Sequence, residues 1–225
     1  MKLACERCPV RDSAACSVLS EDERETLARS GRSRMLARGE TLFAAGEEAQ
    51  ACATLTKGAL KVCSTDEDGT EHILALIHPA GFTGELFVPF ARHDVVALTD
   101  SELCLFARSD MDRALERHPA LSRALLRRRE EELFAARELS ALAAKNSARD
   151  RVVGLLSALA QAASDSPCHA ATRLDLPLSR SEMASMLGLT IESVSRQIGE
   201  LEKSGAIRRN GRRGIEILDP AAFAA

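Results

Sequence analysis

Three cysteines lie close together near the N-terminus, within the stretch CERCPVRDSAAC. Cys5, Cys8 and Cys16 have the spacing Cys-x2-Cys-x7-Cys, which places three soft thiolate ligands for a metal in one short segment. The segment has no helical or strand periodicity, so we expect a loop that is ordered by a bound group. Arg7 and Arg11 would help to keep the thiols ionised. A tetrahedral site or an iron–sulfur cluster normally has four ligands, so a fourth is expected elsewhere in the chain.

The other cysteines are the candidates for this fourth ligand. The chain has seven cysteines, and an odd number argues against a framework of disulfides alone. Cys52, Cys63 and Cys104 fall in a region of short strands, whereas Cys168 lies in a loop and is expected to be a bystander. Strand alternation places Cys104 on the opposite face from its two leucine neighbours, but Cys63 shares a face with a lysine. Alternation therefore leaves the fourth ligand open.

A second group of functional residues lies near the C-terminus: Glu192, Ser195 and Arg196. These types suit the major groove of DNA, because arginine bonds guanine bidentately, glutamate accepts from the cytosine amino group, and serine serves either edge. Glu192 and Arg196 are four residues apart, so on a helix they share a face. We predict that the three contact bases. The alternative is that Glu192 and Arg196 form only a surface ion pair.

Two helices joined by a tight turn are expected to hold these residues. Ser179 and Glu182 form a Ser-x-x-Glu capping box that begins the first helix, and Gly188 ends it. Thr190 caps the second helix, which should run to about Lys203. Ser179 and Thr190 are also predicted to contact DNA phosphates. The positions expected to be buried are Met183, Ala184, Leu187, Ile191, Val194, Ile198 and Leu201.

A predicted hairpin follows these helices, in the stretch AIRRNGRRGIEIL. Asn210-Gly211 is a strong signal for a tight turn between two short strands. Its arginines are expected to form a compact cluster for phosphates: Arg208, Arg209, Arg212 and Arg213. A helix-turn-helix followed by a basic wing predicts that this end of the chain binds double-stranded DNA.

The composition limits the classes of protein that remain. A length of 225 residues is enough for two domains. The net charge of −3 excludes a uniformly basic DNA-binding protein, so attraction to DNA must come from local placement of charge. The lack of Trp and Tyr gives poor support for stacking on single-stranded nucleic acid. We find no signal peptide or apolar run of bilayer length, and expect a cytoplasmic protein without a membrane partner.

Four segments follow from the pattern along the chain, and together they predict an α+β protein. Residues 1–19 form the cysteine-rich segment. Residues 20–108 begin with a short helix at Ser20 and continue as short strands punctuated by glycines, which predicts a β-roll, either a barrel or a jelly roll. Residues 109–146 form a long helical region, and residues 147–225 form the winged helix-turn-helix domain.

The long helical region carries an apolar seam with a charged centre. Its heptad-like positions are Leu121, Leu125, Arg128, Glu132, Ala135, Leu139 and Leu142. The six consecutive charged residues at 127–132 cover more than one turn, so some of them face whatever the seam packs against. We predict a marginal homodimer interface, since a two-fold protein matches two DNA half-sites. The alternative is that the helix packs only on its own β-roll.

With this order of segments, the chain resembles the Crp/Fnr superfamily of transcription regulators over nearly its whole length. It is similar to the oxygen-responsive FNR branch in the cysteine motif from Cys5 to Cys16, and in the recognition-helix pattern E-x-x-S-R at residues 192–196. The fourth cluster cysteine of that branch lies in the strand before the long helix, where SELCLF places Cys104.

The resemblance implies a [4Fe-4S] cluster held by Cys5, Cys8, Cys16 and Cys104. It also implies that the cluster-loaded dimer binds a TTGAT-type inverted repeat, that RNA polymerase is a partner, and that oxygen degrades the cluster and releases DNA. The β-roll resembles a cyclic-nucleotide-binding roll, in which Gly84-Glu85 match part of the phosphate motif. The Arg-Ser/Thr pair of that motif is replaced by Arg92-His93, so no cyclic nucleotide is expected.

Two other functions remain open on the sequence. The cysteines of a Crp-like regulator could instead bind structural zinc or act as thiol redox sensors. From another class, they could serve an iron–sulfur electron-transfer protein or a redox enzyme. That class does not account for the capped helix pair and the wing, and the chain has no G-x-G-x-x-G, H-E-x-x-H or G-x-S-x-G motif. We therefore expect a regulator and not an enzyme.

Overall fold

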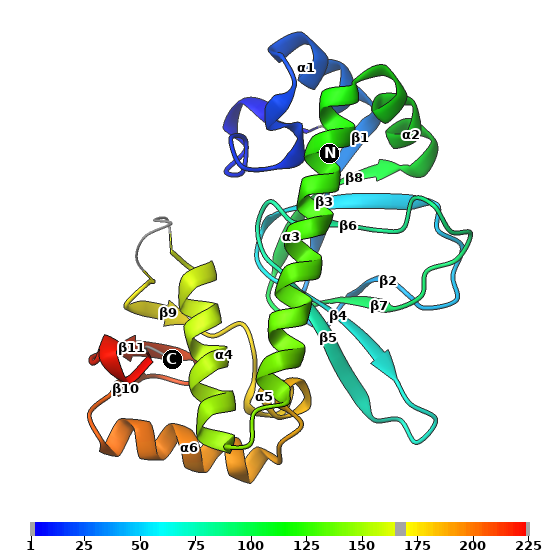
Figure 1. Ribbon diagram of the computed structural model, residues 1–225. Coiled ribbons are helices and arrows are strands. Elements are labelled where there is room, and N and C mark those ends of the chain that lie inside the picture. The colour runs from blue at the N-terminus through cyan, green and yellow to red at the C-terminus, as the bar shows by residue number, and fades with distance from the viewer. Residues whose placement is uncertain (1–2, 165–169, 224–225) are drawn as a thin grey trace. The chain divides into compact units, whose positions relative to one another are not determined.

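The computed structural model describes residues 3–164 and 170–223. Its contacts divide the chain into two compact units, residues 1–135 and 136–225 (Figure 1). The first unit contains the cysteine-rich segment and the roll, and the second contains the helix-turn-helix. Cys168 lies outside the described residues, so its bystander role stays a prediction.

The N-terminal segment is a loop with two short turns of 3-10 helix, η1 (Cys5–Arg7) and η2 (Ala15–Val18). Between these turns, Val10 and Ala14 are buried against Ala80 in a small apolar core. Ala80 belongs to the turn before strand β6 (Phe82–Thr83), so this core attaches the segment to the roll.

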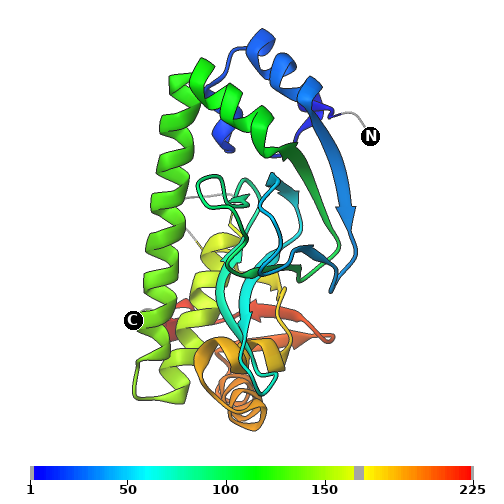
Figure 2. The ribbon, with the colours of Figure 1, turned by 90° about the vertical axis from the view of Figure 1, so that its right-hand side faces the viewer.

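The roll consists of two four-stranded antiparallel sheets, which confirms the prediction (Figure 2). The first sheet has the order β1 (Gly31–Leu36), β8 (Ser101–Ala107), β3 (Ala51–Lys57) and β6 (Phe82–Thr83). The second has the order β2 (Thr41–Phe43), β7 (Asp94–Ala97), β4 (Leu60–Thr65) and β5 (Glu71–Ile77). Apolar side chains from both sheets share one core, including Leu55 and Leu103 of the first and Leu60 and Val95 of the second.

The helical region after the roll consists of two helices, α2 (Arg108–Arg117) and α3 (Pro119–Ala143), where the sequence predicted one continuous region. Pro119 disfavours the helical conformation at His118, whose φ and ψ are −124° and 85°. A proline is well tolerated in the first turn of a helix, because the N–H that it lacks would have no partner there. The chain therefore ends one helix and begins another at this point.

Helix α1 (Glu21–Ser30) and helices α2 and α3 share an apolar core with the first sheet. The predicted start of α1 at Ser20 is confirmed, because the Ser20 side chain accepts a hydrogen bond from the Glu23 N–H. The residues buried in this core include Leu27, Phe106, Met111, Leu121 and Leu125. Leu121 and Leu125 were predicted to lie in the dimer seam. They are instead buried within their own unit, which corrects that prediction.

The charged centre of α3 also contacts its own unit. Arg128 donates a hydrogen bond to the Ser13 carbonyl in the cysteine-rich segment. Glu132 accepts one from the Phe82 N–H at 3.2 Å, and the Arg129 guanidinium lies over the Phe82 ring, 5.1 Å from its centre. Arg128 and Glu132 are thus engaged within the chain, which corrects their assignment to the seam. Half-buried charges are stabilised by polar partners, which here are backbone groups of the cysteine-rich segment and of β6.

The remaining seam positions differ in their burial. Leu142 packs against Gly154 within the second unit, because a Cβ added at Gly154 would collide with the Leu142 side chain. Ala135 is exposed and Leu139 is half-buried. The large apolar side chains that α3 does expose are Leu126 (71%), Leu133 (50%) and Phe134 (65%).

The second unit has the predicted winged helix-turn-helix fold. Its elements are α4 (Ala148–Ala162), β9 (Arg173–Asp175), α5 (Arg180–Leu187), α6 (Ile191–Lys203), β10 (Ile207–Asn210), β11 (Gly214–Ile217) and η3 (Pro220–Phe223). The three strands form an antiparallel sheet in the order β10-β11-β9. Helices α4, α5 and α6 pack together over buried residues that include Val152, Leu156, Met183, Leu187, Val194, Ile198 and Leu201.

The predicted helix ends are confirmed. Ser179 and Glu182 form both hydrogen bonds of the capping box, and Gly188 adopts the left-handed conformation with φ 59°. The Thr190 side chain accepts a hydrogen bond from the Ser193 N–H. These local bonds fix the turn between α5 and α6, and thereby the direction in which α6 leaves it.

Candidate functional site

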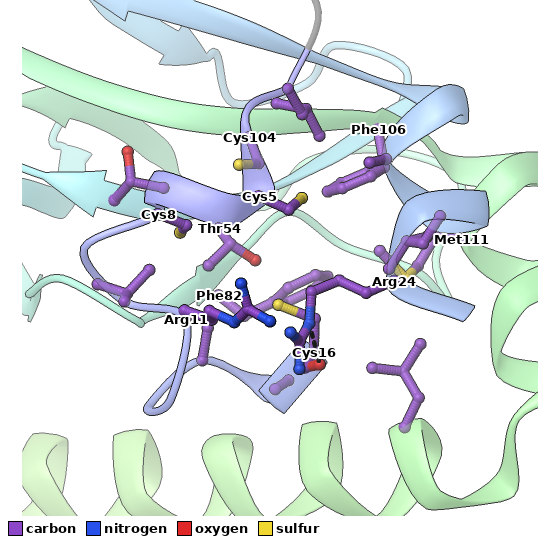
Figure 3. Close-up of a pocket in the computed structure, with 18 of the residues that line it drawn as sticks. Cys5, Cys8, Arg11, Cys16, Arg24, Thr54, Phe82, Cys104, Phe106 and Met111 are labelled. Carbon is purple, nitrogen blue, oxygen red and sulfur yellow. Dashed lines mark hydrogen bonds between the residues drawn. The ribbon is translucent and has the colours of Figure 1, made fainter. Parts of the chain in front are cut away.

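Four cysteines from three parts of the first unit line one pocket (Figure 3). Cys5 and Cys8 come from the N-terminal segment around η1, Cys16 from η2, and Cys104 from the middle of β8. The enclosed cavity measures about 40 Å³. A larger hollow of about 250 Å³ is also lined by Cys5, Cys8 and Cys104. The fold thus gathers four thiols that are up to 99 positions apart in the sequence.

Cys104 is the strand cysteine that joins the N-terminal cysteines. Leu103 and Leu105 are buried between the two sheets, so alternation turns Cys104 to the other face of β8. Cys63 is buried in the second sheet. Cys52 is fully buried in the core under α3 and does not line the pocket. The structure therefore separates three cysteines that alternation in the sequence left equivalent.

Burial determines the protonation of the pocket thiols. It raises the pKa of Cys5 and of Cys16, and the neighbouring Cys8 raises both further. Burial, followed by Cys8, Cys5 and Cys16, raises the pKa of Cys104 to about 12. These mutual effects arise because the four thiols line the same pocket. Thiolates in this pocket therefore need a positively charged partner.

Arg24 of α1 is a residue of this site that the sequence patterns did not indicate. Its guanidinium donates hydrogen bonds to the backbone carbonyls of Cys16 (3.4 Å), Ser17 (3.3 Å) and Leu19 (3.0 Å). Its charge also lowers the pKa of Cys5 and Cys16, against the larger effect of burial. The signal in the sequence is an arginine one turn into the helix that follows the cysteines.

The two arginines that the sequence predicts near the thiols differ. Arg11 lines the pocket and lowers the pKa of Cys5, although it also pairs with Glu21 at 2.8 Å. Arg7 is exposed beside the larger hollow. Arg24 therefore takes much of the role predicted for Arg7.

The four cysteines supply the number and type of donor atoms that an iron–sulfur cluster requires. Within residues 3–164 and 170–223, no three Cys, His, Asp or Glu side chains lie close enough to share one metal ion. In a four-iron cluster each cysteine binds a different iron, so four cysteines around one pocket are compatible with such a cluster.

The N-terminal half of α6 presents the predicted base-contacting residues. Glu192, Ser195 and Arg196 are all exposed. The pKa of Glu192 is lowered by hydrogen bonds from its own backbone N–H and from the Thr190 side chain, and not by Arg196. The Glu192 carboxylate is therefore oriented by the start of the helix rather than by an ion pair with Arg196.

Ile191 does not belong to the buried stripe of α6, contrary to the prediction. The stripe consists of Val194, Gln197, Ile198 and Leu201, whereas 47% of Ile191 is exposed. Ile191 fits the helical spacing of the buried residues, but the core does not extend to this first residue of α6. An exposed apolar side chain next to Glu192 and one turn from Ser195 is suited to contact a thymine methyl group.

The wing arginines do not form the single compact cluster that the sequence predicts. Arg208 and Arg209 are neighbours in β10, so they point to opposite faces of the sheet, and each pairs with a glutamate. Arg213 donates to a backbone carbonyl at 3.3 Å. Arg212 lies exposed in the turn and makes no hydrogen bond or ion pair with another described residue.

Gly84, Glu85 and His93, at positions of the cyclic-nucleotide motif, are among the residues that line a hollow of about 200 Å³. The Glu85 carboxylate accepts a hydrogen bond from the Arg92 N–H at 3.2 Å. Arg129 of α3 reaches the same hollow and donates to the Gly84 carbonyl at 2.7 Å. These polar groups are bonded to one another. That the hollow takes no cyclic nucleotide stays a prediction.

Two domains of known type cover most of the chain. Residues 33–118 match the cyclic nucleotide-binding domain, and residues 150–225 match the Crp-like helix-turn-helix domain. A roll of this type followed by a winged helix-turn-helix defines a DNA-binding transcription regulator. The chain belongs to the Crp/Fnr family. Regulators of this family bind DNA and are typically dimers.

Similar proteins support this membership. A probable transcriptional activator of Rhizobium leguminosarum bv. viciae is 36% identical and is aligned over 96% of this chain and 90% of its own. The transcriptional activator protein FnrL of Cereibacter sphaeroides is 32% identical over 96% of this chain and 88% of its own. The structure of FixK2 from Bradyrhizobium japonicum shares the fold, with a TM-score of 0.77 over 86% of this chain and 95% of its own at 24% identity. Among the described residues, no helix has the length and apolar character to cross a membrane.

Replacing Arg24 by Ala should loosen the cysteine-rich segment. Three carbonyls lose a charged donor, and hydrogen bonds to charged groups contribute about 1.5–3 kcal/mol each. We expect faster amide hydrogen exchange at residues 13–19, with little change in β3 and β8. Arg29→Ala is the matched control, because Arg29 pairs only on the surface of the same helix, with Glu25. Equal exchange in both variants would contradict the role of Arg24.

Proposed function

We propose that this regulator senses oxygen through a [4Fe-4S] cluster held by Cys5, Cys8, Cys16 and Cys104. The observation that carries the proposal is the pocket in which these thiols meet. The cluster would supply reactivity toward oxygen. FnrL, which is 32% identical to this chain, is named after the branch whose cysteine motif the chain resembles.

The chain's own contacts provide a route from the cysteines to α3. Three of the proposed ligands lie in the N-terminal segment and the fourth lies in β8, so a group bound to all of them fixes the segment to the roll. Arg128 of α3 bonds the Ser13 carbonyl of that segment. Without the bound group, the N-terminal segment is no longer fixed to the roll, and the Ser13 carbonyl that accepts this hydrogen bond is no longer held in place. The position of α3 and any interface on it then change.

We propose that the dimer forms along the exposed stripe of α3, and not along the seam that the sequence predicts. Leu126, Leu133 and Phe134 are large, apolar and exposed, whereas Leu121 and Leu125 are already buried. Two copies related by a two-fold axis would cover these side chains. The charged residues Arg127 and Glu130 beside them keep the interface modest in strength.

The dimer would place two α6 helices on the two halves of a TTGAT-type inverted repeat. Glu192, Ser195 and Arg196 would contact base edges, and Ile191 would contact a thymine methyl group. Ser179, Thr190 and Arg212 would bind phosphates at the helix starts and the turn of the wing. Arg208, Arg209 and Arg213 are already bonded within the chain, so their phosphate contacts require those bonds to exchange. RNA polymerase is the proposed partner in transcription.

Replacing any of the four pocket cysteines by Ser should abolish cluster assembly, because serine does not supply the thiolate that iron requires. We expect protein purified without oxygen to contain iron and sulfide and to bleach in air. Cys52→Ser and Cys63→Ser are the controls, since neither lines the pocket. Zinc without sulfide would favour the structural-zinc alternative. Retention of a full cluster by Cys104→Ser would show that the fourth ligand is another residue.

Arg196→Ala and Arg212→Ala should weaken DNA binding in different ways. Loss of the Arg196 guanidinium should cost about 1–3 kcal/mol at one guanine of each half-site and relax the preference for it. Loss of Arg212 should weaken binding to all sequences alike and reduce the salt slope by about 0.9 per contact. Titration of specific and random duplexes at several salt concentrations separates the two. Equal losses on both duplexes for Arg196→Ala would contradict its role at a base.

Leu133→Glu should convert the cluster-loaded dimer to monomer. A buried leucine contributes about 1.5–3 kcal/mol, and a carboxylate at the interface adds a desolvation cost. Sedimentation of the anaerobic protein measures the change. Leu74→Glu is the matched control, because Leu74 is a comparably exposed leucine, at 39%, on strand β5. A stable dimer in Leu133→Glu would mean that another surface of the chain forms the interface.

A further inference from the structure

Arg209 of the wing is held by a carboxylate of the recognition helix. Its backbone N–H donates to one oxygen of Glu202 at 3.2 Å, and its side-chain Nε donates to the other at 2.6 Å. A second guanidinium nitrogen lies 2.5 Å from that same oxygen. These bonds lower the pKa of Glu202, so the carboxylate is ionised at neutral pH. The pair therefore cancels one of the positive charges of the wing.

Glu202 lies on the side of α6 that carries the base-contacting residues. It follows Ser195 by seven residues, which is close to two full turns, so the two side chains share a face. The charge of Arg209 also contributes to the lowered pKa of Arg180, after the larger effect of burial, and Arg180 directly follows Ser179. The Glu202–Arg209 pair thus lies on the face of α6 assigned to DNA.

Another carboxylate of the wing is placed differently. Glu216 pairs with Arg173 at 2.8 Å and with Arg208 at 3.2 Å, across three neighbouring strands. Arg208 precedes Arg209 in β10, so this group occupies the opposite face of the sheet. Ile215, which pairs with Arg209, is buried on the side of the helices. The wing therefore has one carboxylate beside the recognition helix and one on the far face.

We infer that Glu202 regulates the sequence-independent part of DNA binding: it keeps Arg209 from DNA phosphates and so limits affinity for all sequences alike. The inference rests on the proposed DNA-binding face of α6. Phosphate contacts raise affinity for all sequences alike, whereas base contacts raise it for the target only. A carboxylate that pairs with a wing arginine reduces the phosphate contacts and leaves the base contacts unchanged.

The test is Glu202→Gln in the full-length protein, with binding to target and random duplexes measured over a range of salt concentrations. Freed Arg209 should add a phosphate contact, so the salt slope should steepen by about 0.9 on both duplexes. Affinity for random DNA and for the target should rise by the same factor, and the preference for the target should not change. Adding Arg209→Gln to this variant should reverse the change, whereas Arg209→Gln alone should have little effect.

Glu200→Gln is the matched control, because it removes the same charge from an exposed residue of α6 that pairs with no arginine among the described residues. An equal effect of Glu202→Gln and Glu200→Gln would show that only net charge matters and would overturn the inference. Equal melting temperatures of the variants exclude a change in folding. Arg196→Ala tests the underlying assignment separately. If it lowers base preference while Glu202→Gln leaves random binding unchanged, only the inference about Glu202 fails.

Discussion

The cysteine-rich segment is held by polar bonds from neighbouring helices as well as by apolar packing. Val10 and Ala14 form a small core with Ala80, and Ala15 and Leu19 join the core under α1 to α3. The carbonyls of the segment are bonded by Arg24 of α1 and Arg128 of α3. An arginine can bond several carbonyls and still present a positive charge to nearby thiols. The same contacts therefore shape the pocket and connect it to the helix that leaves the roll.

Helix α3 has one surface that packs on the roll and another that is exposed. Leu121, Leu125 and Glu132 attach it to the roll, through apolar packing and a bond to the backbone of β6. Leu126 and Leu133 face away from that core and are exposed. The charges at the centre of the helix contribute to the attachment and are not a defect in an interface. A change in the cysteine-rich segment would thus act on the attached surface, with consequences for the exposed one.

The second unit separates recognition from general attraction to DNA. The residues proposed to contact bases are exposed at the start of α6, whereas most wing arginines are bonded within the chain. A protein with a net charge of −3 gains little from long-range attraction to DNA. Under the proposed function, this arrangement lowers affinity for all sequences and leaves the preference for the target to the base contacts.

The sequence by itself determined the features that depend on neighbouring residues. The capping box at Ser179, the left-handed turn at Gly188 and the wing turn at Gly211 each use bonds within a few residues, so their residue types are sufficient to predict them. The exposure of Glu192, Ser195 and Arg196 on α6 was predictable from the helical period, although that of Ile191 was not. The order of these local patterns also carried the resemblance to a family of transcription regulators.

Only the tertiary structure decided which residues meet across the chain. Strand alternation could not select Cys104, because the choice depends on which face of the roll the N-terminal segment covers. The period of α3 identified an apolar stripe, but the first sheet and helices α1 and α2 bury that stripe and leave another exposed. Arg209 belonged to the predicted basic cluster until its position beside Glu202 was known. Local patterns specify which side chains share a face, whereas packing between distant segments decides what covers that face.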